Sequence, residues 1–417
     1  MLLIWSFLSL FFHQALSTPV RLQLKEINTD IRNNINSANV ADSAKAKATK
    51  FLQDFDVKAN RFQVESGQAN WDYETDLTDD HLKRVVEVGE KISSFYLNAS
   101  VDARLIKTLD LPSNLSRQVS LIARSASPNE KELRVEIATL VGNMTKLYGG
   151  AIVKQKLSNG TVLNLTNSDL SEIFVESRNR TLLDWAWVEW RNAVGPPMKR
   201  NFASLMDYLN IGAREHSWID YGSFLRSDYE MSDIEEILDE VWKQIEPLYQ
   251  ELHAYVRFRL TSIYNINTTN CIPASLLGDT FAQNWENIFD IVKPTKDSKT
   301  FDVTKELVKQ NYTVNKIFKL AESFFTSIGL DEMPESFWNR SVLVKPKDKE
   351  MVCHASAWDV SKDDVRFVNV CYCCINKICG VFKTRYDGFI TYPNSFVECL
   401  IDIHFCSKLM ACFFQKL

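Results

Sequence analysis

The chain has 417 residues and a formal net charge of −5; 24% of its residues are charged and 45% are hydrophobic. This composition is typical of a globular protein, and it excludes a disordered chain, a collagen-like chain and a small disulfide-rich domain. Because 48 basic residues are set against 53 acidic ones, no basic excess is available for phosphates, and we expect no nucleic-acid partner.

The N-terminus predicts a secretory signal peptide over residues 1–17. Leu2–Phe12 form an apolar run, and Ala15-Leu16-Ser17 supplies a small-residue cleavage pattern before Thr18. No Lys or Arg precedes the run, so a buried N-terminal helix is the alternative. No later stretch reaches the roughly 18 uninterrupted apolar residues of a membrane span. We therefore expect a secreted, extracellular chain without a membrane span.

Hydrophobic periodicity predicts a mostly all-α fold. Apolar residues recur at helical spacing in five segments, which are 79–95, 127–149, 170–194, 232–255 and 311–328. In the second segment Ser127, Pro128 and Glu130 match an N-cap, a first helical proline and a capping box. The expected helix ends are Gly149-Gly150, Gly195-Pro196-Pro197 and Gly329, and Pro247 is an expected kink.

Other local patterns complete this outline. A hairpin is expected over 150–165, with its turn at Asn159-Gly160. Trp185, Trp187 and Trp190 lie within a helical stripe, and we expect them in the core rather than around a cofactor.

Nine N-x-[ST] sequons agree with an extracellular surface, and they all fall between residues 98 and 341. The expected glycosylation sites are Asn98, Asn114, Asn143, Asn159, Asn164, Asn179, Asn267, Asn311 and Asn339. The nine cysteines are less evenly spread, because only Cys271 and Cys353 precede residue 370. In a secreted chain an odd number leaves at least one thiol unpaired or paired to another chain.

Several sequence runs resemble the angiotensin-converting enzyme family of zinc dipeptidyl carboxypeptidases. They are residues 70–75 (NWDYET), 184–191 (DWAWVEWR), 246–249 (EPLY) with 252–257 (LHAYVR), 272–279 (IPASLLGD), 282–285 (AQNW), 324–330 (FFTSIGL) and 353–359 (CHASAWD). The resemblance covers about residues 45–366 in the family's order. It implies a helical ellipsoid with a central peptide channel and N-terminal lid helices, incomplete here. It also implies removal of dipeptides from the C-termini of short peptides by a zinc-bound water, with chloride as an activator.

The resemblance assigns candidate substrate-binding residues. Gln283 resembles the glutamine that binds the C-terminal carboxylate of the peptide, and His354 resembles a histidine that hydrogen-bonds a substrate carbonyl. Ala355 and Ala357 resemble residues whose backbone pairs with the extended peptide. Short peptides with a free C-terminal carboxylate are therefore the expected partners.

Further positions carry over to chloride sites and a disulfide. Arg191 and Tyr229 resemble residues at two chloride sites, and Phe281 replaces a tryptophan usual in the family, so the chloride environment can differ there. The spacing of Cys353 and Cys371 resembles that of a family disulfide. Coincidence is the alternative explanation of this spacing.

The zinc chemistry of the family has no counterpart in the sequence. Hydrolysis in this class needs a His-Glu-x-x-His helix and a distant third ligand. None of the six histidines begins such a motif, and no two lie within four positions of each other. His81 and His253 are expected to be structural or surface residues. We therefore expect no catalytic residue, no metal ligand and no cofactor in this chain, and no hydrolysis by it.

Three domain segments are expected, which are the signal peptide at 1–17, the N-terminal portion of the peptidase-like domain at 18–366, and a Cys-rich tail at 367–417. The tail has three interpretations: a product of altered splicing or an erroneous gene model, a real interaction tail, or a metal site. The side chains that would form the metal site are Cys371, Cys373, Cys374, Cys379, His404 and Cys406. Cys371-Tyr372-Cys373-Cys374 lacks the paired spacing of a structural zinc site.

The leading functional interpretation is a peptidyl-dipeptidase of this family by resemblance, inactive with this sequence. Two alternatives remain open. One is a secreted, non-catalytic protein that binds or sequesters peptides, and the other is a fragment that pairs with a complete relative.

Overall fold

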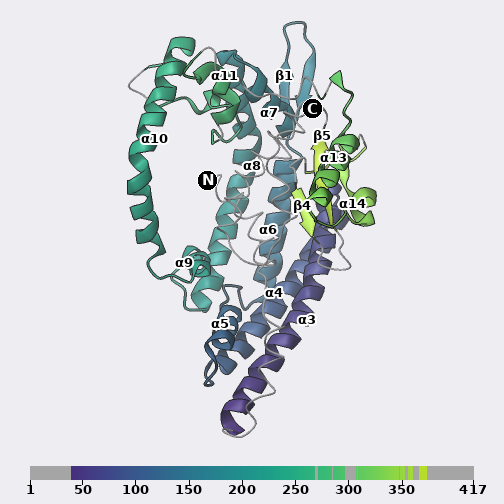
Figure 1. Ribbon diagram of the computed structural model, residues 1–417, viewed down its shortest axis with the longest axis vertical. Coiled ribbons are helices and arrows are strands. Elements are labelled where there is room, and N and C mark those ends of the chain that lie inside the picture. Colours follow the sequence, from purple (N-terminus) through teal and green to yellow (C-terminus); the bar gives the residue numbers. More distant parts are fainter. Residues whose placement is uncertain are drawn as a thin grey trace. The chain divides into compact units, whose positions relative to one another are not determined.

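The computed structural model describes residues 39–267, 271–283, 285–295, 307, 309–346, 348–352, 356–359 and 366–372. This part of the chain is mostly helical, as the periodicity predicted (Figure 1). It forms two compact units, one from Met1–Thr139 with Asp302–Leu417 and the other from Leu140–Phe301. The predicted signal peptide and most of the predicted tail lie outside the described residues. Across the described ranges, no helix has the length and hydrophobicity that crossing a membrane requires.

Three helices build the core of the first unit. They are α3 (Asn39–Thr75), α4 (Asp79–Lys107) and α5 (Ser113–Ile122). The Thr78 side chain caps α4 by accepting a hydrogen bond from the backbone N–H of His81. This helix runs beyond Phe95, its expected end, because Ala103 and Ile106 continue its buried face. They join one cluster with residues of α3 and α5, which are Ala48, Leu52, Leu115 and Val119.

The start of α6 (Lys131–Gly149) corrects the predicted capping box. The helix begins at Lys131, so Ser127 is not its cap and Pro128 is not its first residue. Instead, the backbone N–H of Ser127 donates to Ser125 Oγ at 3.2 Å. The predicted end at Gly149 is confirmed.

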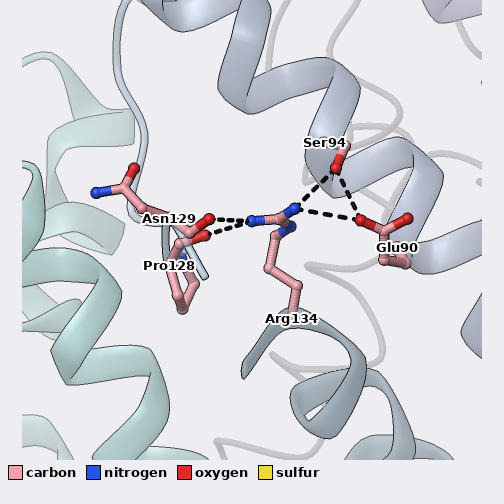
Figure 2. Close-up of polar contacts among 5 residues, drawn as sticks. All are labelled: Glu90, Ser94, Pro128, Asn129 and Arg134. Carbon is pink, nitrogen blue, oxygen red and sulfur yellow. Dashed lines mark hydrogen bonds and ion pairs between the residues drawn. The ribbon is translucent and has the colours of Figure 1, made fainter. Parts of the chain in front are cut away.

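The reason for this late start is Arg134, which is 8% exposed (Figure 2). Its Nη1 donates to the carbonyl oxygens of Pro128 and Asn129 at 2.9 and 2.7 Å. Its Nη2 donates to Ser94 Oγ at 2.9 Å and to Glu90 Oε1 at 3.2 Å. Residues 128 and 129 therefore bond to a buried guanidinium rather than forming a helical turn.

Two small sheets accompany the helices. Strands β1 (Val153–Lys156) and β2 (Val162–Leu165) pair antiparallel, with Gly160 at φ 85°, so the predicted hairpin is confirmed. In the first unit β3 (Val342–Val344), β4 (Ser356–Asp359) and β5 (Arg366–Tyr372) form a sheet in the order β3-β5-β4. Strand β4 pairs antiparallel with β5, and β3 pairs parallel with it.

In the second unit the predicted helix at 170–194 is wrong, because two helices replace it. Helix α7 (Asn167–Glu176) ends where Arg178 donates to the carbonyl oxygens of Val175 and Ser177, both at 2.9 Å. Helix α8 (Arg180–Glu215) starts anew with Asn179 as its N-cap.

Helix α8 also continues through Gly195-Pro196-Pro197, which we expected to end it. An interior proline costs about 3 kcal/mol or more, because it removes a helical hydrogen bond. Burial outweighs this cost, since Trp190 and Val194 before the prolines and Met198 and Leu205 after them are all buried. The single helix is favoured because its apolar face continues across the break.

The remaining helices are α9 (Tyr221–Arg226), η1 (Ser227–Tyr229), α10 (Ile234–Tyr264), η2 (Ala274–Leu276), η3 (Trp285–Ile288), α11 (Phe289–Val292), α13 (Val314–Ser327) and α14 (Glu335–Arg340). Helix α10 runs through Pro247. Helix α13 begins at Val314 with Thr313 as its cap, since Asn311 has a positive φ of 55°. It ends before Gly329, which has φ 96°.

Candidate functional site

In the first unit the C-terminal end of α3 holds the chain segment that leads into β4. The backbone N–H of Leu77 donates to the Glu350 carbonyl oxygen at 2.8 Å. The backbone N–H of Val352 donates to the Glu74 carbonyl oxygen, also at 2.8 Å. An ion pair joins Lys349 Nζ and Asp76 Oδ2 at 3.3 Å. We call this contact, with residues 71–77 on one side and 349–352 and 356–359 on the other, the α3–β4 junction.

Aromatic packing completes the junction. Trp71 and Trp358 are 5% and 3% exposed, and their rings meet edge to face with centroids 5.8 Å apart. Trp358 is the third residue of β4, so this contact anchors the strand directly to α3. Both residues lie within the sequence runs that carried the resemblance, but nothing in their spacing indicated that they touch.

Strand β4 is an edge strand of its sheet. Because the strand order is β3-β5-β4, one side of β4 pairs with β5, while no described strand pairs with the other. Ala357 lies in β4 opposite Val368 of β5. A free strand edge can accept an extended peptide by backbone hydrogen bonding. Ala355 and His354 themselves lie outside the described residues.

Glu74 is the unpaired charge of the junction. Burial raises the pKa of Glu74 to about 7. No cation among the described residues forms an ion pair with it. Burial, with the charges of Asp79 and Glu74, also raises the pKa of the adjacent Tyr73 above its usual range. Perturbed carboxyl groups cluster at functional sites, and sequence reasoning did not single out this residue.

In the second unit Arg191 connects α8 to the loop that carries Gln283. Its Nη2 donates to the Thr280 carbonyl oxygen at 2.9 Å, and its Nη1 to the Trp187 carbonyl oxygen at 3.1 Å. The guanidinium carbon lies 3.1 Å from the centroid of the Trp187 ring, a cation–π contact. Thr280 is three residues before Gln283, which is exposed. Arg191 is thus placed to hold this loop.

The charge of Arg191 is not neutralised by any described carboxylate. Burial lowers the pKa of Arg191 to about 10, and the nearby Tyr148 acts in the opposite direction. The Tyr148 ring packs edge to face on Trp190, with centroids 5.3 Å apart. Trp190 is 2% exposed and lies in the core, as expected. A half-buried guanidinium without a carboxylate partner fits a small anion such as chloride.

Tyr229 lies elsewhere in the same unit. It ends η1 and is 48% exposed. The preceding α9 is attached near the C-terminal end of α8, where the backbone N–H of Tyr221 donates to Asn210 Oδ1 at 2.9 Å. Arg191 precedes Asn210 by 19 residues on that helix, and at 1.5 Å per residue this is roughly 28 Å. The structure therefore does not bring Tyr229 and Arg191 into one site.

The loop between η2 and η3 is shaped by Ala282, which has φ 58°. Trp285 Nε1 donates to the Ala282 carbonyl oxygen at 3.2 Å and closes the turn around Gln283. Phe281, the departure from the family pattern, is half-buried in this loop. In the described part of this loop, Gln283 is therefore exposed.

The remaining site predictions concern cysteines and histidines. Cys271 is a free, exposed thiol, whereas Cys353 and the Cys371 side chain lie outside what the structure describes, so the disulfide stays a prediction. His81 Nδ1 lies 2.9 Å from the Asp76 carbonyl oxygen, and His253 packs beside Tyr249, which fits structural roles. Within the described ranges, no three His, Cys, Asp or Glu side chains gather as a metal site requires.

The sequon asparagines are mostly accessible. Eight of the nine are exposed, and Asn143, within α6, is half-buried. Asn159 lies at the tip of the β1–β2 hairpin, where its Oδ1 accepts a hydrogen bond from the Thr161 N–H at 3.0 Å. That contact leaves the amide nitrogen, the atom to which a glycan is attached, uninvolved.

Comparison with known proteins gives one consistent result. A family profile described as angiotensin-converting enzyme matches residues 42–390. Angiotensin-converting enzyme of Bos taurus is 37% identical over 321 residues, or 75% of this chain, and that of Rattus norvegicus is 36% identical over 330 residues, or 76%. Angiotensin-converting enzyme of Theromyzon tessulatum is 35% identical over 335 residues, or 78%. The chain spans 24% of the length of each mammalian relative and 54% of the third. The matched range extends past Arg366, where we expect a departure from the family, and that boundary stays a prediction.

Proposed function

Because this chain belongs to the angiotensin-converting enzyme family of peptidyl-dipeptidases, we propose that it binds short peptides through their backbone and C-terminal carboxylate, without hydrolysing them. The observation that carries the proposal is β4, a strand anchored to α3 with one side free of described strands. Peptide binding is the family's general property, and the specific residues are our proposal.

The proposed binding mode uses two elements. An extended peptide adds to the free edge of β4 and bonds the backbone of Ala355 and Ala357, while His354 bonds a peptide carbonyl. Gln283, exposed on its loop, donates its amide N–H to the C-terminal carboxylate. From the family resemblance, we also propose the family's fold, a helical ellipsoid with a central peptide channel and N-terminal lid helices, incomplete here. A chloride bound at Arg191 would strengthen the loop that holds Gln283.

We propose that the chain does not hydrolyse peptides because of the metal-binding side chains that its sequence contains. The family uses zinc, which in this class is held by two histidines one helical turn apart and a third ligand. No pair of histidines in the 417 residues has that spacing, so the residues present do not fit the metal. Without it, no group here activates water against a peptide carbonyl. The chain is then a pseudoenzyme within a family of metallopeptidases.

The compartment is part of the same proposal. A cleaved signal peptide over 1–17 would deliver a secreted glycoprotein, and the exposed sequon asparagines support this. Treating the secreted chain with a glycosidase, which should lower its mass, and then mapping its peptides tests both points. Mapping would also identify the residues that come after Arg366 in the native protein.

Binding can be tested by titrating labelled peptides against the purified full-length chain. A peptide with a free C-terminal carboxylate should bind at least tenfold more tightly than its amide, because one charge-assisted hydrogen bond contributes about 1.5–3 kcal/mol. Gln283→Ala should remove this preference. The control, Gln250→Ala on the polar side of α10, should keep it. Equal affinity for both peptides in the unmodified chain would contradict the proposal.

A further inference from the structure

The tip of the β1–β2 hairpin carries Asn159-Gly160, and no other asparagine in the 417 residues is followed by glycine. Ser158, Asn159 and Gly160 form a three-residue loop, which the Leu157 N–H closes by donating to the Thr161 carbonyl oxygen at 2.8 Å. The Gly160 N–H donates to the Leu157 carbonyl oxygen at 3.0 Å, and Gly160 has φ 85°. This loop type places a left-handed residue at its last position, which favours glycine.

The loop is open to solvent. Residues 158–164 are all exposed, whereas Val153, at the other end of the hairpin, is 3% exposed and joins the core. Apart from its chain neighbours, no described atom lies within 4 Å of the position that a Cβ on Gly160 would occupy. Water and hydroxide therefore reach the peptide group between Asn159 and Gly160, and no side chain screens its nitrogen.

The Asn159 side chain is folded back along the backbone that follows it. Its Oδ1 accepts a hydrogen bond from the Thr161 N–H at 3.0 Å, which is an Asx turn. Because this bond spans the Gly160 peptide group, it keeps the side-chain carbonyl on the side of the Gly160 nitrogen. The same N–H would stabilise negative charge on Oδ1 if that nitrogen attacked Cγ, as donors do in acyl transfer.

From this combination we infer that Asn159 is a site of spontaneous deamidation in every copy of the chain whose Asn159 carries no glycan. The Gly160 nitrogen loses its proton to hydroxide and bonds to Asn159 Cγ. The bond from Cγ to Nδ2 breaks, and the amide nitrogen leaves as ammonia with a proton from water. A water molecule then opens the cyclic imide at either carbonyl carbon, which gives aspartate or isoaspartate. In total one water is consumed and one ammonia is released.

One contact opposes the attack. The Gly160 N–H must leave the Leu157 carbonyl oxygen before its nitrogen can react. An exposed backbone hydrogen bond has a small net free energy, so this contact slows the reaction by about tenfold at most. Every other asparagine in the chain is followed by a residue with a side chain, which crowds the attacking nitrogen and restricts its backbone. Asn159 therefore remains the favoured position for this chemistry.

A glycan on Asn159 would block the reaction, because it is attached to Nδ2, the nitrogen that has to leave. The two modifications thus compete for one amide group, and only copies without the glycan change with time. Deamidation adds a negative charge, and isoaspartate also adds a carbon to the backbone between Leu157 and Thr161. The hydrogen bonds that close the loop should then weaken. The inference does not rest on the proposed peptide-binding function.

A matched pair of variants at the exposed Thr161 tests the inference on the purified full-length chain. Thr161→Ala removes the sequon and keeps Asn159-Gly160, whereas Thr161→Ser keeps both. Each variant is aged at neutral and at mildly alkaline pH, and its peptides are mapped by mass spectrometry with any glycan left in place. The internal control is Asn129, an exposed loop asparagine outside any sequon that is followed by Glu130.

In Thr161→Ala, Asn159 should convert to aspartate and isoaspartate at least about fivefold faster than Asn129 converts, because glycine leaves the attacking nitrogen uncrowded. The rate should rise with pH, and glycan-bearing Asn159 of Thr161→Ser should stay unchanged. Conversion of Asn159 in Thr161→Ala no faster than that of Asn129 would overturn the inference. A rate independent of pH, or equal conversion of glycan-bearing Asn159, would also overturn it, because the first step is proton loss and Nδ2 is the leaving nitrogen.

Discussion

Two sets of charged residues in this protein differ in their partners. In the helix pair around Arg134, the guanidinium and Glu90 form an ion pair at 3.2 Å, and Ser94 and two carbonyl oxygens accept further hydrogen bonds, while Arg134 Nε has no partner among the described residues (Figure 2). Among the candidate site residues, Glu74 of the first unit and Arg191 of the second have no charged partner in the part of the chain that the structure describes. Burial alone would raise the pKa of Glu90, but hydrogen bonds from Ser94 and Arg134 hold that pKa below its usual range. Burial raises the pKa of Glu74 to about 7 instead.

The difference separates stabilising charges from available ones. A buried charge that has an ion-pair partner and several hydrogen bonds fixes local structure, and removing one partner leaves the other desolvated and alone. A half-buried charge without a partner costs stability and stays free to meet a ligand. By this criterion the Arg134 cluster is structural, whereas Arg191 and Glu74 mark the regions in which a ligand would compensate the charge.

The largest effect is expected at Arg134. Arg134→Met keeps the aliphatic volume but strands Glu90 and the carbonyl oxygens of Pro128 and Asn129. We expect the free energy of unfolding to fall by about 3–5 kcal/mol, measured by urea denaturation. The control is Lys50→Met, which breaks an exposed ion pair with Asp54 and should cost less than about 1 kcal/mol. Similar losses of unfolding free energy in Arg134→Met and Lys50→Met would contradict the structural role of the Arg134 cluster.

Glu74 should destabilise the fold as pH rises. A carboxyl whose folded pKa is about 7 and whose ordinary pKa is 4.5 binds more protons when folded, so stability falls as pH rises from 4.5 to 7. Glu74→Gln should remove that slope and raise the free energy of unfolding at pH 7.5 by about 1–3 kcal/mol. Denaturant titrations across this pH range measure the effect.

In the same experiment, Glu90 should affect the pH dependence of stability in the direction opposite to Glu74. Its folded pKa is lowered, so its contribution is present above the unfolded pKa and is lost as pH falls through the folded value. Glu90→Gln should therefore destabilise the chain at neutral pH, and the difference from the unmodified chain should shrink in acid. If Glu74→Gln and Glu90→Gln change the free energy of unfolding in the same direction at neutral pH, the contrast between these two carboxyl groups is wrong.

The smallest effect concerns anion binding at Arg191. At constant ionic strength, replacing gluconate by chloride should stabilise the chain by about 1 kcal/mol, through binding to the folded state only. Arg191→Gln should remove this response while keeping the overall fold, and Arg200→Gln, an exposed position on the same helix, should retain it. A chloride response unchanged by Arg191→Gln would exclude Arg191 as the site.

Local sequence signals predicted the elements wherever a nearby residue decides the backbone. Gly149 and Gly329 end their helices as expected, and Asn159-Gly160 forms the turn of its hairpin. The same signals were wrong at 128 and at 196–197. At residue 128, the buried Arg134 bonds the carbonyl oxygens that the expected first helical turn would use. At residues 196–197, the burial of apolar side chains on both sides outweighs the free-energy cost of the two prolines. Both outcomes depend on tertiary contacts, which a local pattern does not contain.

The candidate site was predictable only in its residue types. The sequence runs identified Arg191, Gln283 and Ala357, but not that Arg191 bonds the loop of Gln283 through Thr280. The contact of Trp71 with Trp358 joins residues 287 positions apart, and no spacing rule reaches that far. Glu74 became notable only through its burial.

Peptide cleavage by the purified full-length chain tests the central claim most directly. The chain would be incubated with a short peptide bearing a free C-terminal carboxylate and with added zinc, and released dipeptide would be measured by mass spectrometry with and without a chelator. We predict that the peptide binds and stays intact under both conditions. Dipeptide release that the chelator abolishes would contradict the claim that this chain binds peptides without hydrolysing them.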